Sequence, residues 1–299
     1  MWSLLRETFE AWKRDRAARL GAAIAYYTMV SLAPLLIIAV AIGGAVFGEA
    51  AARGEIVEQI GMLIGEESAR GIQTILEQAQ QQPKSGLHAG LLGITVLLVG
   101  AAGVFIQLQD ALNAIWRVRP KLHSALKETL QKYLVSFSMV IGIGFLLLVS
   151  LVMSAMLSGL SKYMGSLMPD NLLTVQWINQ LLSLALITLL LAVMFKFVPD
   201  VKLAWRDVWG AAALTSLLFT IGKFFIGLYL GHSGISSAYG AAGSLVVILI
   251  WVYYSTQIML FGVEFTKCYK KRRGSQIVAE PHAERFVRKV RQPEPGKGD

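Results

Sequence analysis

The chain has 299 residues, of which 55% are hydrophobic and only 16% are charged, and its formal net charge is +9. Its apolar residues come in long blocks, which is typical of a membrane protein and argues against a soluble globular domain. The density of Lys and Arg alternates between high and low across these blocks. The basic excess therefore indicates membrane topology and argues against a nucleic-acid groove. The one cysteine, Cys268, excludes an intrachain disulfide.

The N-terminal segment, residues 2–19, predicts an amphipathic helix that lies flat on the membrane surface. Trp2, Leu5, Phe9 and Trp12 fall on one helical face, and the other face is charged. Six apolar blocks follow, each close to or above the roughly 20 residues that cross a bilayer. They cover residues 24–46, 88–108, 134–157, 173–197, 208–230 and 241–262.

These patterns predict an all-α polytopic membrane protein with a six-helix transmembrane domain over residues 1–266. Six spans with basic ends place both termini in the cytosol. The loop 47–88, with its excess of Glu, then lies outside, and residues 55–82 predict two short amphipathic helices there, with a break near Gly65. Residues 267–299 predict a basic, largely disordered cytosolic tail, in which residues 280–292 are expected to form a short helix.

The first span contains a proline in the stretch "AYYTMVSLAPLL". Pro34 removes one backbone hydrogen bond and disfavours the carbonyl of Val30. Ser31 can satisfy a freed backbone group. The sequence predicts a helix kink at Ser31 and Pro34, and it leaves open whether the kink is a static packing feature or a hinge.

The fifth block, "TSLLFTIGKFFIGLYL", places Lys223 inside an apolar run. Ser216, Thr220 and Gly227 lie on the same helical face as Lys223. Small and hydroxyl residues on one stripe favour a face turned toward other helices or a polar cavity. These four residues then form a candidate binding site for a lipid phosphate, a carboxylate or another anion. The alternative is that Lys223 snorkels to the outer headgroups.

Polar residues also gather near the inner ends of two spans. Gln107 and Asp110 share one face at the end of the second span, with Asn113 just beyond, and Tyr254, Gln257 and Glu264 share one face of the sixth. Polar groups at membrane depth are costly unless they are paired, so both stripes are expected to face inward. They form either an interhelical hydrogen-bond network or an inner vestibule or gate. Pairing of Asp110 or Glu264 with Arg117, Arg119 or Lys196 is equally compatible with the sequence.

The sequence lacks the common signatures of catalysis. Its four histidines are isolated and show no metal-ligand spacing, and there is no Walker A loop, nucleophile elbow or dinucleotide fingerprint. We therefore expect no metal, no cofactor and no enzymatic activity.

Four stretches together resemble the YihY/BrkB family of bacterial inner-membrane proteins. They are "AAAIAYYTMVSLAPLL", "LNAIWRVRP", "FVPDVKLAWRDVWGAAALTSLLF" and "YGAAGSLVVILIWVYYSTQIMLFGVEF". The resemblance covers about residues 5–270 and implies a six-helix protein of the bacterial inner (plasma) membrane. The family once carried a ribonuclease BN label, to which the scattered histidines give no support, since such a nuclease needs clustered ligands for a catalytic metal.

The sequence and the resemblance together predict an inner-membrane transporter or permease that moves lipid or an anionic envelope solute. The expected partners are membrane lipids, including anionic headgroups, and a small anion or lipid substrate, with no nucleic acid. A homo-oligomer is compatible with the sequence. The alternative is a non-transporting membrane scaffold that organises envelope partners or lipids through the helices of 55–82 and the basic tail.

Overall fold

The computed structural model describes residues 2–64, 66–81, 87–121, 172–232, 239 and 242–286. The described part of the chain is almost wholly helical. Its helices are α1 (Trp2–Arg14), α2 (Ala17–Phe47), α3 (Glu49–Ile64), α4 (Glu66–Gln81), α5 (Leu87–Trp116), α7 (Leu172–Phe197), α8 (Trp205–His232) and α10 (Gly243–Arg272). The described part also contains two short strands, β1 (Val118–Pro120) and β2 (Ala283–Arg285).

Three helices in the described ranges are long and apolar enough to cross a membrane. They span Ala17–Ala45, Trp205–Tyr229 and Gly243–Arg272. Helices α5 and α7 cover the second and fourth expected blocks, whereas the third, residues 134–157, lies outside the described residues. A mostly helical architecture with helices long and apolar enough to span a membrane is therefore confirmed, and the count of six spans stays a prediction.

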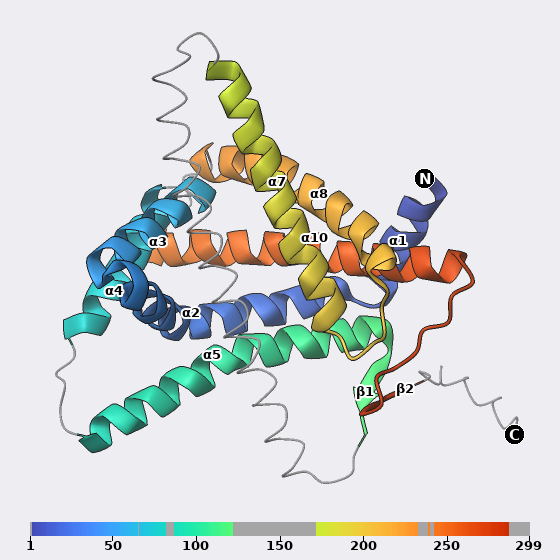
Figure 1. Cartoon of the computed structure of the whole chain (residues 1–299), viewed down its shortest axis with the longest axis horizontal. Helices are drawn as coiled ribbons and strands as arrows, with labels where there is room; N and C mark the ends of the chain where they lie inside the picture. Colours follow the sequence, from blue (N-terminus) through green and yellow to red (C-terminus); the bar gives the residue numbers. More distant parts are fainter. Residues whose placement is uncertain are drawn as a thin grey trace, which may run out of the picture.

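Helices α2 and α10 run side by side along the length of the molecule, α7 crosses α10 steeply, and different small elements lie at the two ends of the α2–α10 pair (Figure 1). Helix α2 packs against α5 and α10, and α8 packs against α7 and α10. Figure 1 shows α3 and α4 together at one end of the α2–α10 pair, and α1, β1 and β2 at the other. We call these the hairpin end, defined by α3 and α4, and the sheet end, defined by α1, β1 and β2.

Two helices occupy the region where two short amphipathic helices are expected. Helix α3 begins at Glu49, earlier than the expected residue 55, and the break falls between Ile64 and Glu66. Ile72 and Leu76 of α4 are buried against Leu36 and Val40 of α2 and Ile248 of α10. This satellite core holds the α3–α4 hairpin on the bundle, because burial of these side chains removes apolar area from solvent.

The N-terminal helix is shorter than expected. Helix α1 ends at Arg14, and Arg16 adopts a left-handed backbone conformation with φ of 55°. A left-handed residue cannot continue a right-handed helix, so residues 17–19 belong to α2 and not to the surface helix of 2–19. The turn also directs Asp15 toward α10.

The C-terminal end of α10 and the segment after it also differ from expectation. The helix continues to Arg272, well past the expected end of the sixth block at residue 262. Strand β2 pairs antiparallel with β1, with Val118 opposite Arg285 and Pro120 opposite Ala283. A strand therefore stands where part of a short helix (280–292) is expected, because the ladder to β1 supplies the backbone partners and Ala283 is buried.

The main hydrophobic core lies toward the sheet end. Leu112, Ile115 and Trp116 at the end of α5 are almost completely buried. They belong to one core cluster with Val201 from the loop 198–204 and Leu260 from α10. The sheet end is therefore closed by close side-chain packing among segments that are far apart in sequence.

Candidate functional site

A buried polar cluster at the sheet end is centred on Asp200, in the loop between α7 and α8. Its carboxylate accepts hydrogen bonds from Nε2 of Gln109 at 3.1 Å and from Nδ2 of Asn113 at 2.7 Å. The backbone N–H of Asp200 donates in return to Oδ1 of Asn113 at 2.9 Å. Nε2 of His282 lies 3.1 Å from the same carboxylate. We call Gln109, Asn113, Asp200 and His282 the Asp200 cluster.

A second cluster joins the turn after α1 to α10 and α5. Lys267 forms ion pairs with Asp15 and, at 2.9 Å, with Oε2 of Glu264. Arg117 reaches Oδ1 of Asp15 at 3.4 Å. Glu264 is fully buried, and its Oε1 has no hydrogen-bond partner among the described residues. We call Asp15, Arg117, Glu264 and Lys267 the Asp15 cluster.

The ionisation of Asp15 reflects these surroundings. Partial burial raises the pKa of its carboxyl, but the hydrogen bond and the positive charge of Lys267, helped by Arg117, outweigh burial. The pKa of Asp15 is therefore lowered from its ordinary value of 3.8. Asp15 is an anion at neutral pH and holds Lys267 in place.

Further ionic contacts tie α8 to the same end. Nζ of Lys270 lies 3.4 Å from Oδ2 of Asp207, and both side chains are buried. Lys196 donates to the carbonyl of Leu203 at 2.8 Å and stands over the Trp205 ring. Charged side chains at the sheet end thus join α10 to α8 and to the turn between α1 and α2, which also contacts Arg117 after α5.

The structure separates the predicted inner-vestibule residues. Asn113 and Gln109, four residues apart on one helical face, are both buried, whereas Gln107 lies on another face. Gln107 is half-buried and Asp110 is exposed. Sequence reasoning therefore missed Gln109 as the second helical partner of Asp200.

The three residues predicted to share one face of α10, namely Tyr254, Gln257 and Glu264, contact different neighbours. Gln257 donates to the carbonyl of Ala18 at 3.4 Å, and a Cβ placed on Gly21 would overlap Nε2 of Gln257. Tyr254 packs at Gly222 of α8. Glu264, at the end of the stripe, lies in the Asp15 cluster. Gln257 and Glu264 thus approach the start of α2, whereas Tyr254 faces α8.

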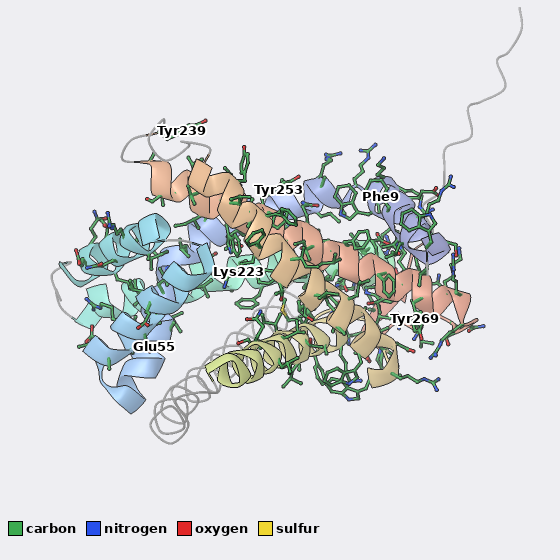
Figure 2. All side chains as sticks on the ribbon, turned by 90° about the horizontal axis from the view of Figure 1, so that it is seen from above. Phe9, Glu55, Lys223, Tyr239, Tyr253 and Tyr269 are labelled. Carbon is green, nitrogen blue, oxygen red and sulfur yellow. The ribbon has the colours of Figure 1, made fainter. Side chains whose placement is uncertain are left out.

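Of the Lys223 stripe on α8, Ser216 contacts α7. Ser216 is buried, and its hydroxyl lies 2.7 Å from that of Thr188. Thr220 donates to the carbonyl of Ser216 at 2.9 Å, and Gly227 is exposed. Lys223 is half-buried, and among the described residues it has neither a hydrogen bond nor an ion pair. In Figure 2 it lies part-way along the molecule, between the end that holds Glu55 and the end that holds Tyr269.

Pro34 lies inside an uninterrupted α2, and Ser31, one turn earlier, is buried. The Oγ of Ser31 is 3.6 Å from the point that a Cβ on Gly103 would occupy. The side chain of Ser31 therefore faces α5 at a place where a glycine allows the two helices to approach closely.

The hairpin end contains two adjoining cavities that share Glu49 and Arg53. One, of about 580 Å³, lies between α3 and α4 and is also lined by Ala50, Gly54, Val57, Gln73 and Glu77. The other, of about 330 Å³, extends along α2 and is also lined by Ile37, Val40, Ala41, Gly44 and Leu76. The sequence signal for this site is weak, because Glu49 and Arg53 form an i, i+4 pair that is common on exposed helices.

The comparison with known proteins decides the family. The family model described as virulence factor BrkB matches residues 8–287. These residues include all members of the Asp200 cluster and of the Asp15 cluster. The chain belongs to the BrkB family. Its relatives include UPF0761 membrane proteins from Verminephrobacter eiseniae, 29% identical over 88% of this chain and 60% of the relative, and from Ralstonia nicotianae, 31% identical over 83% of this chain and 54% of the relative. No solved structure matches the chain.

This BrkB-family chain spans about 60% of the length of the first of these relatives. The relatives are named as membrane proteins, in agreement with the apolar helices found here. In the described part of the chain, no group of three or more His, Cys, Asp or Glu side chains is arranged to hold a metal ion.

Proposed function

We propose that the protein is a bacterial inner-membrane permease for lipid or an anionic envelope solute, closed at the sheet end and open at the hairpin end. The observation that carries this proposal is the contrast between the two ends of the α2–α10 pair. Buried ion pairs of Asp15, Glu264 and Lys267 join α10 to the start of α2 at the sheet end. A charged cavity of about 580 Å³ lies at the hairpin end. Alternating access requires such a difference between ends.

The distribution of charge supports a topology of six spans with both termini in the cytosol. Basic residues from distant segments gather at the sheet end, as positive-inside topology requires. They include Lys13, Arg14, Arg117, Arg119, Lys196, Lys202, Lys267, Lys270, Lys271 and Arg272. Exposed Phe197, Trp205 and Trp209 lie at the same level, where aromatic side chains mark a membrane–water interface. The α3–α4 hairpin then covers the outer end.

The proposed activity is transport without enzymatic chemistry, metal or cofactor, and the proposed partners are membrane lipids. Lys223, on α8, supplies a cation within the apolar part of the bundle. Because a half-buried ammonium group at membrane depth is costly without a partner, an anionic ligand would stabilise it. The hydroxyls of Ser216 and Thr220 make contacts within the protein, so Lys223 is the member of its stripe available to a ligand.

Transport is tested by reconstituting the purified chain into vesicles that contain phospholipids with a fluorescent headgroup. Dithionite destroys the fluorophore only in the outer leaflet, so a permease for lipid increases the fraction lost relative to protein-free vesicles. Equal loss with and without protein would contradict lipid transport. The alternative, a membrane scaffold, would then be favoured, and the closely packed core at the sheet end would be its rigid platform.

The closed sheet end is tested with the native Cys268, which is buried one residue after Lys267. We expect an impermeant maleimide to label it slowly in wild type. Asp15→Asn should accelerate labelling, because it removes the anion that holds Lys267, and the acceleration should appear in inside-out vesicles only. The matched control is Glu10→Gln, which alters an exposed pair with Arg6 on α1. Faster labelling from the opposite side would overturn the topology.

A further inference from the structure

The cavities at the hairpin end combine charged groups of both signs with an apolar wall. Glu49 and Arg53 form an ion pair at 2.9 Å, in which the side chain of Glu49 is 61% exposed and that of Arg53 only 21%. On α4, Gln73 donates to Glu77 at 2.8 Å. The smaller cavity continues from the ion pair along Ile37, Val40 and Leu76. The guanidinium group of Arg53 thus lies deeper than the two carboxylates, at the border of apolar surface.

The balance of charge selects among ligand classes. A simple anion that bound Arg53 would lie beside the carboxylates of Glu49 and Glu77, which line the same cavity. A simple cation that bound Glu49 would lie beside the guanidinium group of Arg53. A ligand of one sign therefore meets a like charge in this cavity, and like charges repel. A ligand with an anionic group beside a cationic one compensates Arg53, Glu49 and Glu77 together.

We propose that this cavity binds a phospholipid whose headgroup carries an ammonium group next to its phosphate. The phosphate would accept paired hydrogen bonds from Arg53, since a guanidinium matches phosphate geometry. The ammonium group would lie between Glu49 and Glu77. One acyl chain would follow the apolar wall of Ile37, Val40, Ala41 and Leu76. This apolar wall selects the lipid over a soluble zwitterion with the same headgroup, because the chain gains apolar contact there.

This inference deepens the proposed function by naming a lipid class, but it concerns binding and does not require transport. The test is native mass spectrometry of the purified full-length chain with equal amounts of an ethanolamine phospholipid and a glycerol phospholipid of identical acyl chains. We expect preferential retention of the ethanolamine lipid. Arg53→Gln should weaken its retention about tenfold, the effect of one lost charge-assisted contact. The double variant Glu49→Gln with Glu77→Gln should abolish or reverse the preference.

Matched controls come from the same hairpin. Arg70 and Glu58 are exposed on α4 and α3 and do not line the cavities, so Arg70→Gln and Glu58→Gln should leave the preference unchanged. Glu49 and Arg53 form a helical i, i+4 pair of small energetic weight, so their variants should fold. A thermal denaturation curve for each variant checks this.

The inference would be overturned by equal retention of both lipids by wild type, or by undiminished retention of the ethanolamine lipid by Arg53→Gln. A third arm adds soluble glycerophosphoethanolamine as a competitor. Displacement of the lipid at comparable concentration would assign the site to soluble zwitterions and overturn the lipid assignment. Selective binding without lipid movement in the vesicle assay would uphold the site and reject only the permease. Lipid movement without selective binding would contradict only the proposed lipid site at the hairpin end.

Discussion

Asn113 and Asp200 are joined by two hydrogen bonds of opposite direction. Nδ2 of Asn113 donates to the carboxylate of Asp200, and Oδ1 of Asn113 accepts from the backbone N–H of Asp200. The two residues are 87 positions apart, and both are buried. This reciprocal pair fixes the loop 198–204 against the end of α5. It satisfies a backbone donor that would otherwise be buried without a partner.

Exchange of the two side chains tests this pairing. Asn113→Asp alone places two carboxylates face to face and removes the donor to Asp200, so we expect it to lower the free energy of unfolding by about 2 to 3 kcal/mol. In the double variant Asn113→Asp with Asp200→Asn, the amide at position 200 donates to the carboxylate at position 113, which also accepts from the backbone N–H of residue 200. The double variant should recover stability to within about 1 kcal/mol of wild type.

The free energies are measured by SDS titration in detergent micelles, with tryptophan fluorescence as the readout. Asp110→Asn serves as the control because Asp110 is exposed one turn earlier on α5. A double variant no more stable than Asn113→Asp alone would show that the Asn113–Asp200 contact does not hold the loop.

The lowered pKa of Asp15 predicts the pH dependence of the Asp15 cluster. A carboxyl with a lower pKa in the folded state stabilises the fold above its unfolded pKa, and this contribution is lost as the pH falls through the folded value. Asp15→Asn should therefore destabilise the protein by about 1 to 2 kcal/mol at neutral pH. The difference between wild type and variant should shrink once the pH falls below 3.8, the ordinary value for Asp.

The measurement is the SDS midpoint of both proteins between neutral and acidic pH. Glu10→Gln provides the comparison because Glu10 is exposed in a pair with Arg6. A difference between wild type and Asp15→Asn that grows on acidification would contradict the assigned direction of the shift.

Gly262 marks a close approach of α10 to α8. A Cβ at this position would overlap Oγ1 of Thr215 and lie 3.0 Å from Cζ of Phe195. Gly262→Ala should therefore cost about 1 to 3 kcal/mol, the usual range for overpacking a core. Thr215→Ala removes the overlapping hydroxyl, so the double variant should be more stable than Gly262→Ala.

Gly210→Ala is the matched control, since no atom lies within 4 Å of a Cβ at Gly210 on α8. It should raise stability by about 0.5 to 1 kcal/mol, because alanine favours a helix interior over glycine. Thermal unfolding of the four proteins in one detergent gives the comparison. Equal loss of stability in Gly262→Ala and in the double variant would show that the overlap with Thr215 is not the cause of the destabilisation.

The apolar blocks predict the long helices well, because transfer of apolar side chains dominates at this length. The ends of α7 fall within one residue of the prediction, whereas the start of α2 and the end of α10 do not. Helix α10 extends to Arg272 because Lys267 and Lys270 find buried acids, and these partners come from other elements. The pairing of Asp200 with Gln109 and Asn113 is equally invisible in one sequence, since it depends on how a loop docks on a distant helix.

The cavity at the hairpin end could not be located from sequence for a related reason. The stripe of Ile72 and Leu76 predicts an amphipathic helix, but it does not say which helix covers it. Burial of Ile72 and Leu76 against Leu36 and Val40 positions α4 beside α2. This packing brings the exposed pair of Glu49 and Arg53 next to apolar surface.

Lys223 provides a test that separates a ligand site from a snorkelling side chain. If its ammonium group binds an anionic ligand, Lys223→Met should reduce lipid movement in the vesicle assay about tenfold, the value of a lost charged contact. Lys223→Arg keeps the charge and should retain most of the activity. Thermal stability of Lys223→Met should equal or exceed that of wild type, because an apolar side chain replaces a half-buried cation.

Lys13→Met, at an exposed position on α1, controls for loss of a surface charge. Wild-type lipid movement by Lys223→Met would show that the ammonium group of Lys223 only reaches the headgroups, and it would remove Lys223 from the transport site.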